Sequence, residues 1–187
     1  SLSSTNRYWP QWRYPAGLAP VDIKESMPSS AYRKLMEAFA CMGTAPSSES
    51  RVVDLGASPG GWTAALRRLG SRVIAIDRSP LREDLMKDEK VYFVQGDAFA
   101  YSPDTPVDWM VSDFIAYPDR VHELLNNWCK QKWADYMVVT VKFQGAEVPF
   151  EELDKMVTAS SRYGYSCRVK HFFNNKNEVT MMIQRDQ

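Results

Sequence analysis

The sequence RVVDLGASPGGWT, residues 51–63, contains an apolar run, then three glycines and a proline, and then a tryptophan. The apolar run predicts a buried strand, and the glycine-rich segment predicts a tight turn into a helix. Glycines at such a turn allow the backbone to approach a ligand at the N-terminus of the helix. We therefore expect an α/β protein that binds a ligand at this turn.

On both sides of the turn, apolar strands alternate with helical patterns. Strands are expected at residues 51–56, 71–77, 91–97, 107–113, 136–143, 166–173 and 178–184. Helices are expected from Ser29, with Leu35, Met36, Phe39 and Ala40 on one face, and at residues 61–70, 79–86, 121–128 and 153–164. This alternation predicts a mostly parallel seven-stranded sheet, covered by helices on both faces, with an antiparallel pair at one edge.

The N-terminal segment differs from the rest of the chain. Residues 1–28 hold four prolines among tyrosines and tryptophans, a composition that favours an extended arm. Residues 29–187 are expected to form one domain with its own core. The 23 basic and 23 acidic residues cancel, so any nucleic-acid binding would have to come from local patches.

The cysteines suit neither a disulfide framework nor a metal site. Cys41, Cys129 and Cys167 are odd in number and far apart, so we expect buried thiols in a reducing compartment and no bound metal. No apolar run approaches the roughly 18 residues of a membrane span, and the start of the chain does not resemble a signal peptide. These features favour a cytoplasmic protein without a membrane partner.

Four strands in succession end in an acid. Asp54, Asp77, Asp97 and Asp113 would therefore line one rim of a parallel sheet, where ligands bind in this class of fold. Asp77 lies 21 residues after Gly56, the position where an acid binds ribose hydroxyls, and Asp97 could accept from an adenine amine. The alternative is that each aspartate only caps a loop or a helix start. The four together favour a nucleoside-containing cofactor.

The glycine spacing separates two kinds of cofactor. Dinucleotide-binding enzymes use G-x-G-x-x-G to place a pyrophosphate at the helix N-terminus, whereas this loop is G-x-x-x-G-G with Pro59 inside. The wider loop suits the amino-acid end of S-adenosylmethionine better than a pyrophosphate. A nicotinamide-dependent oxidoreductase remains the alternative on this evidence.

DLGASPGGWT resembles the cofactor loop of the FtsJ-like ribose 2′-O-methyltransferases of RNA, whose pattern is close to D-x-G-x-x-P-G-G-[WF]. The resemblance extends from about Pro28 to Ile183 and implies a Rossmann-like methyltransferase fold that uses S-adenosylmethionine. The cofactor-binding residues it implies are Asp54, Gly56, Ala57, Ser58, Pro59, Gly60, Gly61, Trp62, Asp77, Arg78, Asp97, Ala98 and Asp113.

The resemblance also implies a Lys-Asp-Lys-Glu catalytic tetrad. PSSAYRKLMEAF supplies Lys34, VDWMVSD supplies Asp113, VVTVKFQG supplies Lys142, and NEVTMMI supplies Glu178. Lys142 is our candidate base, and the two acids would orient the lysines and the substrate hydroxyl. Taken alone, Lys34 could be a solvated helix residue and Glu178 a hairpin residue. A shift of one residue along its strand would turn Lys142 to the opposite face.

Within the family, the motifs are most similar to those of the large-subunit ribosomal RNA cytidine 2′-O-methyltransferases, which implies ribosomal RNA as the substrate. Those proteins have an RNA-binding domain ahead of the catalytic one, so we expect such a domain or a partner protein to deliver the RNA. The alternative is a catalytically silent scaffold that binds RNA or a ribosome-assembly intermediate. Expected RNA contacts are Arg7, Tyr8, Trp9, Trp12, Arg13, Tyr14, Arg33, Arg78, Arg82 and Arg120, although the arm's aromatics could instead pack on the domain.

Overall fold

The computed structural model describes residues 29–113, 116–144, 148–172 and 177–187. Its strands are β1 (Arg51–Leu55), β2 (Arg72–Asp77), β3 (Val91–Gln95), β4 (Val107–Ser112), β5 (Ala134–Lys142), β6 (Tyr165–Lys170) and β7 (Glu178–Arg185). Its α-helices are α1 (Ser29–Met42), α2 (Gly61–Arg68), α3 (Glu83–Met86), α4 (Pro118–Lys130) and α5 (Phe150–Arg162). A short 3-10 helix covers Ala98–Ala100.

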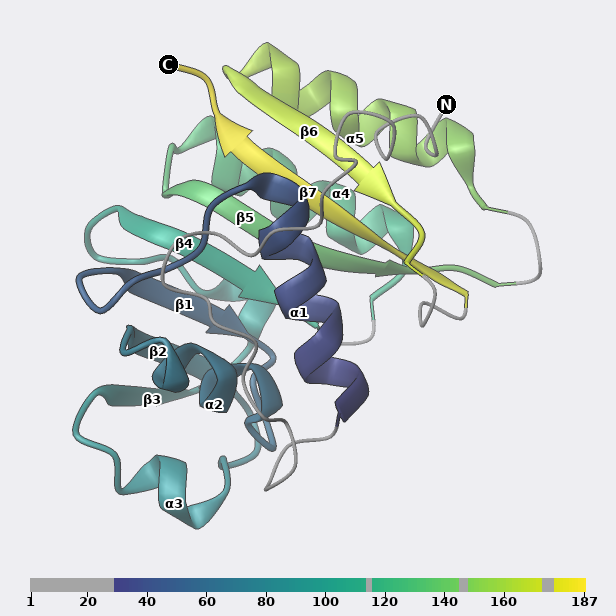
Figure 1. The fold of residues 1–187 in the computed structure, drawn as a ribbon. Helices are drawn as coiled ribbons and strands as arrows, with labels where there is room; N and C mark the ends of the chain where they lie inside the picture. The colour runs from purple at the N-terminus through teal and green to yellow at the C-terminus, as the bar shows by residue number, and fades with distance from the viewer. Residues whose placement is uncertain (1–28, 114–115, 145–147, 173–176) are drawn as a thin grey trace.

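The strands form one seven-stranded sheet in the order β3-β2-β1-β4-β5-β7-β6 (Figure 1). The first five strands are parallel to one another, and β7 runs antiparallel to both β5 and β6. The predicted mostly parallel sheet with an antiparallel edge is therefore confirmed. The reversal in strand order beside β1 places the carboxyl ends of β1, β2 and β4 around one crevice, where ligands bind in such sheets.

Alternating side chains divide the core into two layers. In β1, Val52 packs with α1 and α2, whereas Val53 packs with α4 and α5 on the opposite face. The same alternation separates Met137 from Val138 in β5. The two-residue period of a strand therefore gives each face of the sheet its own helical cover, as predicted.

Several boundaries differ from those predicted. The helix expected at 79–86 is a single turn, α3, because Arg82 has extended backbone angles and Pro80 lies just before it. In contrast, α5 begins at Phe150, earlier than the apolar pattern indicated. Cys167 is partly exposed, which corrects the prediction of three buried thiols.

Two further expectations concern a membrane span and the N-terminal arm. None of the described helices is long and apolar enough to cross a bilayer. The predicted arm at residues 1–28, with its arginines and aromatics, lies outside the described residues.

Candidate active site

The loop after β1 is held in place by its backbone and by a buried acid. The N–H groups of Gly56 and Ala57 both donate to Ile76 O, at 2.8 and 3.1 Å, which ties the loop to β2. Asp54 is only 2% exposed and accepts a 2.7 Å hydrogen bond from the Thr63 hydroxyl of α2. The loop therefore connects β1, β2 and α2 as a fixed unit.

Gly60 shows why this loop requires glycine. Its φ of +123° is unfavourable for residues with a side chain, and a Cβ would lie 2.3 Å from Leu85 Cδ1 of α3. As the N-cap of α2, Gly60 also has no side chain to cap the helix. The first N–H groups of α2 therefore remain suited to an anionic group of a ligand.

Two aspartates lie in the crevice at the ends of β2 and β3. Asp77 accepts hydrogen bonds from Ser58 N at 2.9 Å and from Ser79 N at 3.0 Å, so its carboxylate is fixed by the backbone. Asp97 Oδ1 accepts from Phe99 N at 2.9 Å, while its Oδ2 lies 3.6 Å from Arg78, too far for a strong hydrogen bond. One oxygen of Asp97 is therefore available to a ligand.

A cavity of about 370 Å³ lies between these acids. It is lined by Gly56, Asp77, Arg78, Gly96, Asp97, Ala98, Phe99 and Arg120. A Cβ on Gly96 would meet no atom within 4 Å, so the cavity is open at this point. The volume is within the range of sites that hold small organic ligands.

The four residues of the expected tetrad come together at the carboxyl end of the sheet. Lys34 Nζ lies 2.7 Å from Asp113 Oδ1 and 2.7 Å from Glu178 Oε1. Lys142 Nζ lies 2.6 Å from Glu178 Oε2. Glu178 therefore bridges the two lysines, and the site is a continuous chain of ion pairs.

Strand pairing explains how the distant residues meet. Lys142 ends β5, Glu178 begins β7, and the two are partners in the antiparallel register. This register turns Lys142 towards Lys34, which answers the question of the strand face. The side chain of Glu178 is only 5% exposed, whereas that of Lys142 is 33% exposed. Lys142 is thus the lysine more accessible to a substrate.

For Lys34 and for Asp113, burial and the oppositely charged neighbours shift the pKa in opposite directions. Burial alone would lower the pKa of Lys34, but attraction to Asp113 and Glu178 outweighs it, so the pKa of Lys34 is raised above its ordinary value. Burial raises the pKa of Asp113, although Lys34 partly offsets that effect. Lys34 is therefore held as an ammonium group between the two carboxylates.

Asp54 lies deeper than the other strand-end acids. Burial raises its pKa to about 7, with the Thr63 hydrogen bond opposing the shift and the charges of Asp113 and Asp77 adding to it. Because Asp54 is fully buried, it supports the loop from below rather than lining the open cavity.

Two supporting residues have roles that sequence reasoning missed. The Thr140 hydroxyl of β5 donates to Asp113 Oδ1 at 3.1 Å; its position two residues before Lys142, on the same strand face, was a usable signal. Trp62 was expected to bind the cofactor, but it is buried, and its indole N–H donates to Ala31 O of α1 at 2.9 Å. Trp62 therefore links the glycine-rich loop to the helix that carries Lys34.

The arginines predicted to contact RNA have different surroundings. Arg33 is exposed on α1, Arg82 is paired with Asp84 at 3.3 Å, and the guanidinium of Arg120 lies 4.2 Å from the Phe99 ring centroid. Arg78 and Arg120 both border the cavity. No group of acidic, histidine or cysteine side chains in the described part of the chain could hold a metal ion.

Comparison with known proteins found a matching family and several curated relatives. Residues 27–146 match the FtsJ-like methyltransferase family. The chain is 34% identical over 182 residues to ribosomal RNA large subunit methyltransferase M of Thauera aminoaromatica, a match that covers 91% of this chain and 50% of that protein. A second protein of that name, from Halorhodospira halophila, is 31% identical and is covered to 52%. The chain thus spans about half the length of the curated relatives it matches.

Solved structures share the fold at low sequence identity. A protein of Lactococcus lactis provisionally named a hemolysin has a TM-score of 0.69 at 15% identity, with 87% of this chain and 90% of that chain covered. A TehB-like SAM-dependent methyltransferase from Corynebacterium glutamicum has a TM-score of 0.56 at 19% identity, with both chains fully covered. At these identities the likeness concerns the fold.

Proposed function

The chain belongs to the FtsJ-like methyltransferase family, and on that premise we propose that it transfers a methyl group from S-adenosylmethionine to a ribose 2′-hydroxyl of ribosomal RNA. The observation that carries the proposal is the chain of ion pairs from Asp113 through Lys34 and Glu178 to Lys142. These charged groups lie at the same edge of the sheet as the glycine-rich loop. The names of the relatives support ribosomal RNA as the substrate class.

The crevice residues fit the proposed cofactor. Asp77 would bind the ribose hydroxyls, the free oxygen of Asp97 would accept from the adenine amine, and the N-terminus of α2 would face the carboxylate. The open space at Gly96 supports this assignment, because a side chain there would project into the cavity. When bound, S-adenosylmethionine supplies a methyl group that is already activated by its sulfonium.

The protein's part in the reaction is to position a weak nucleophile and to accept its proton. As the 2′-oxygen forms its bond to the methyl carbon, the bond from that carbon to the sulfonium would break and S-adenosylhomocysteine would leave with the electron pair, while the hydroxyl proton passes to Nζ of Lys142 in its amine form. The charged Lys34, fixed by two carboxylates, orients the hydroxyl from the other side. Glu178 Oε2, 2.6 Å from Lys142 Nζ, stabilises the ammonium group that results. Alignment in this fixed site contributes much of the rate.

The direct test uses labelled S-adenosylmethionine and ribosomal RNA. We expect label in the RNA, and nuclease mapping should place it on a 2′-O-methylated nucleotide. Transfer of label to protein or DNA, or to a base atom, would contradict the substrate assignment. Calorimetry should detect S-adenosylmethionine and not NADH, which separates the proposal from an oxidoreductase.

Substitution of Lys142 tests the chemistry separately from binding. Lys142→Ala should abolish methylation and retain cofactor binding, because Lys142 lies outside the cofactor cavity. The matched control is Lys155→Ala, an exposed lysine on α5, which should keep full activity. Undiminished activity in Lys142→Ala would rule out Lys142 as the base, and absence of activity in the unsubstituted chain would favour the scaffold alternative.

A further inference from the structure

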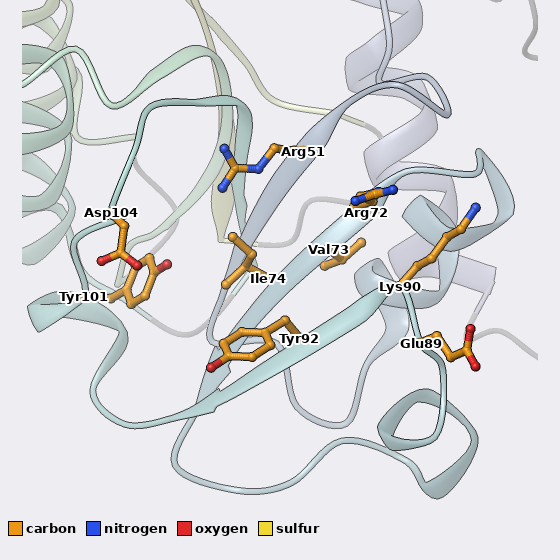
Figure 2. A pocket seen from close by; sticks show the side chains of 9 residues that line it. All are labelled: Arg51, Arg72, Val73, Ile74, Glu89, Lys90, Tyr92, Tyr101 and Asp104. Carbon is orange, nitrogen blue, oxygen red and sulfur yellow. The ribbon is translucent and has the colours of Figure 1, made fainter.

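On the face of the sheet that carries α4 and α5, no helix of the described residues covers the part formed by β2 and β3. Between β3 and β4 the chain forms only the 3-10 helix Ala98–Ala100, so no α-helix from this connection packs on β2 and β3. A hollow of about 600 Å³ lies there, lined by Arg51, Arg72, Val73, Ile74, Glu89, Lys90, Tyr92, Tyr101 and Asp104 (Figure 2). We name this hollow the β-face groove. Side chains two residues apart in a strand point to the same face, so Arg51 lies on the face of Val53 and Arg72 on the face of Ile74. That is the face on which α4 packs.

The groove combines aromatic rings with an apolar floor. Tyr92 is 70% exposed, and its register partner Ile74 is partly buried beside it. Tyr101 approaches from the β3–β4 connection, so the two rings lie around Ile74 (Figure 2). Tyr101 is partly buried, whereas the exposed ring of Tyr92 provides a stacking surface for an unpaired base.

The rim of the groove carries three cationic side chains. Arg51 and Arg72 are register partners on adjacent strands, but the guanidinium of Arg51 donates to the Thr105 hydroxyl just before β4, on the side of β1 away from β2. Within the described ranges, no carboxylate lies within 4.0 Å of the charged nitrogens of Arg51, Arg72 or Lys90. The arrangement therefore suits a polyanion.

The position of the acids limits how the polyanion lies. Glu89 and Asp104 also border the groove and lie at its two ends (Figure 2), and Asp104 directly precedes Thr105, the hydrogen-bond partner of Arg51. The Arg51 side chain is oriented by a 2.9 Å hydrogen bond to the Thr105 hydroxyl, which leaves its other donors free for a phosphate. A short stretch of backbone phosphates would contact the centre of the β-face groove and would not extend to the acids at its two ends.

We propose that the β-face groove binds a single-stranded segment of the RNA substrate that is separate from the methylated nucleotide; this rests on the proposed function. Arg72 and Lys90 lie at or before the amino ends of their strands, whereas the tetrad lies at the edge of the sheet where the parallel strands have their carboxyl ends. A six-residue strand such as β2 spans about 16 Å between its end residues, so the two sites cannot share one nucleotide. The groove gives affinity and orientation, and the tetrad performs the chemistry.

The experiment measures binding of a fluorescent single-stranded RNA of mixed sequence over a series of salt concentrations. Arg72→Ala should weaken binding and reduce the slope of log K against log salt by about 0.7, the value for one lost phosphate contact to a single strand. The matched control is Arg68→Ala, an exposed arginine on α2 that packs on the opposite face, and it should leave both quantities unchanged.

The stacking part of the proposal has its own pair of variants. Tyr92→Ala should weaken RNA binding about tenfold, whereas Tyr92→Phe should retain most of the affinity because the ring remains. Thermal unfolding should show that both variants fold, since the Tyr92 side chain is mainly exposed. Equal affinity for wild type, Arg72→Ala and Tyr92→Ala would overturn the proposal. So would unchanged RNA affinity with an altered oligomeric state in light scattering, because that result would assign the groove to a second copy of the chain.

A methylation assay on the same proteins separates the two proposals. If wild type methylates ribosomal RNA and the groove variants bind RNA as wild type does, the groove assignment fails and the proposed function stands. If wild type methylates no RNA while Arg72→Ala still lowers affinity and salt slope, the proposed function fails and the groove assignment stands.

Discussion

Thr140 supports Asp113 from the neighbouring strand, and its effect can be tested in isolation. Thr140→Val keeps the side-chain shape but removes the 3.1 Å hydrogen bond to Asp113 Oδ1. Because a hydrogen bond to a charged group contributes about 1.5–3 kcal/mol, we expect kcat to fall by about tenfold or more. Steady-state kinetics should show the loss in kcat with little change in cofactor affinity, and Thr140→Ser should restore activity. A Thr140→Val enzyme with wild-type kcat would exclude a positioning role.

Asp54 should make the free energy of unfolding decrease as the pH rises, which is the opposite of the usual effect of an aspartate. Its pKa is about 7 in the folded protein, above the value of about 3.9 for an unfolded chain, so the folded state holds the extra proton between these pH values. The stabilisation is fully present below pH about 4 and is lost as the pH rises through about 7. Each unit of raised pKa corresponds to about 1.4 kcal/mol.

The comparison that isolates this effect uses Asp54→Asn, which can still accept the Thr63 hydrogen bond. Urea unfolding of the ligand-free proteins between pH 4 and 8 should show the variant gaining stability relative to wild type as the pH rises. If the difference in free energy of unfolding between the two proteins stayed constant from pH 4 to 8, Asp54 would not titrate in this range.

At the scale of elements, the loop between β1 and α2 depends on how closely it packs against α3. Gly60→Ala would place a Cβ 2.3 Å from Leu85 Cδ1 at a backbone φ of +123°. Overpacking and backbone strain together should lower the free energy of unfolding by about 2 kcal/mol or more. Gly96→Ala is the matched control for stability, because its Cβ would meet no atom within 4 Å. Denaturant unfolding should show a large loss for the first variant and little for the second; equal losses would refute this account.

The elements also show what the sequence could and could not predict. Strand positions followed from apolar runs, and Gly70 and Gly164 marked helix ends with φ of +87° and +83°. A short helix was expected at residues 79–86, but α3 begins only at Glu83 because Arg82 has extended backbone angles. The β3–β4 connection was expected to be a loop, but the hollow that this leaves on β2 and β3 depends on how the surrounding side chains pack, which local patterns do not show.

Over the whole molecule, exchange of backbone amides should differ between the sheet's centre and its β3 edge. β5 and β7 are paired on both sides, whereas β3 is an edge strand without a fully buried residue. Hydrogen exchange should therefore be faster in β3 than in β5 and β7. S-adenosylhomocysteine should slow exchange at residues 96–99, which border the cavity, and leave α5 unaffected. Equal slowing in both segments would argue against binding in this cavity.

The candidate site was predictable only in part, because its residues are far apart in the sequence. Asp113 followed from its place after a buried strand, but Lys34 and Glu178 had ordinary local explanations, and only the family resemblance singled them out. Their contact joins residues 144 positions apart in the chain. Such a contact depends on the place of β7 in the strand order, which local patterns do not encode.

The insertion of β7 between β5 and β6 has a consequence for biosynthesis. During translation, Lys34, Asp113 and Lys142 leave the ribosome before Glu178 does, and β6 has no strand to pair with until β7 arrives. The nascent chain can bury much of its parallel sheet early, but Lys34 and Lys142 then lack their shared carboxylate. The chain of ion pairs is therefore completed only when β7 closes the sheet.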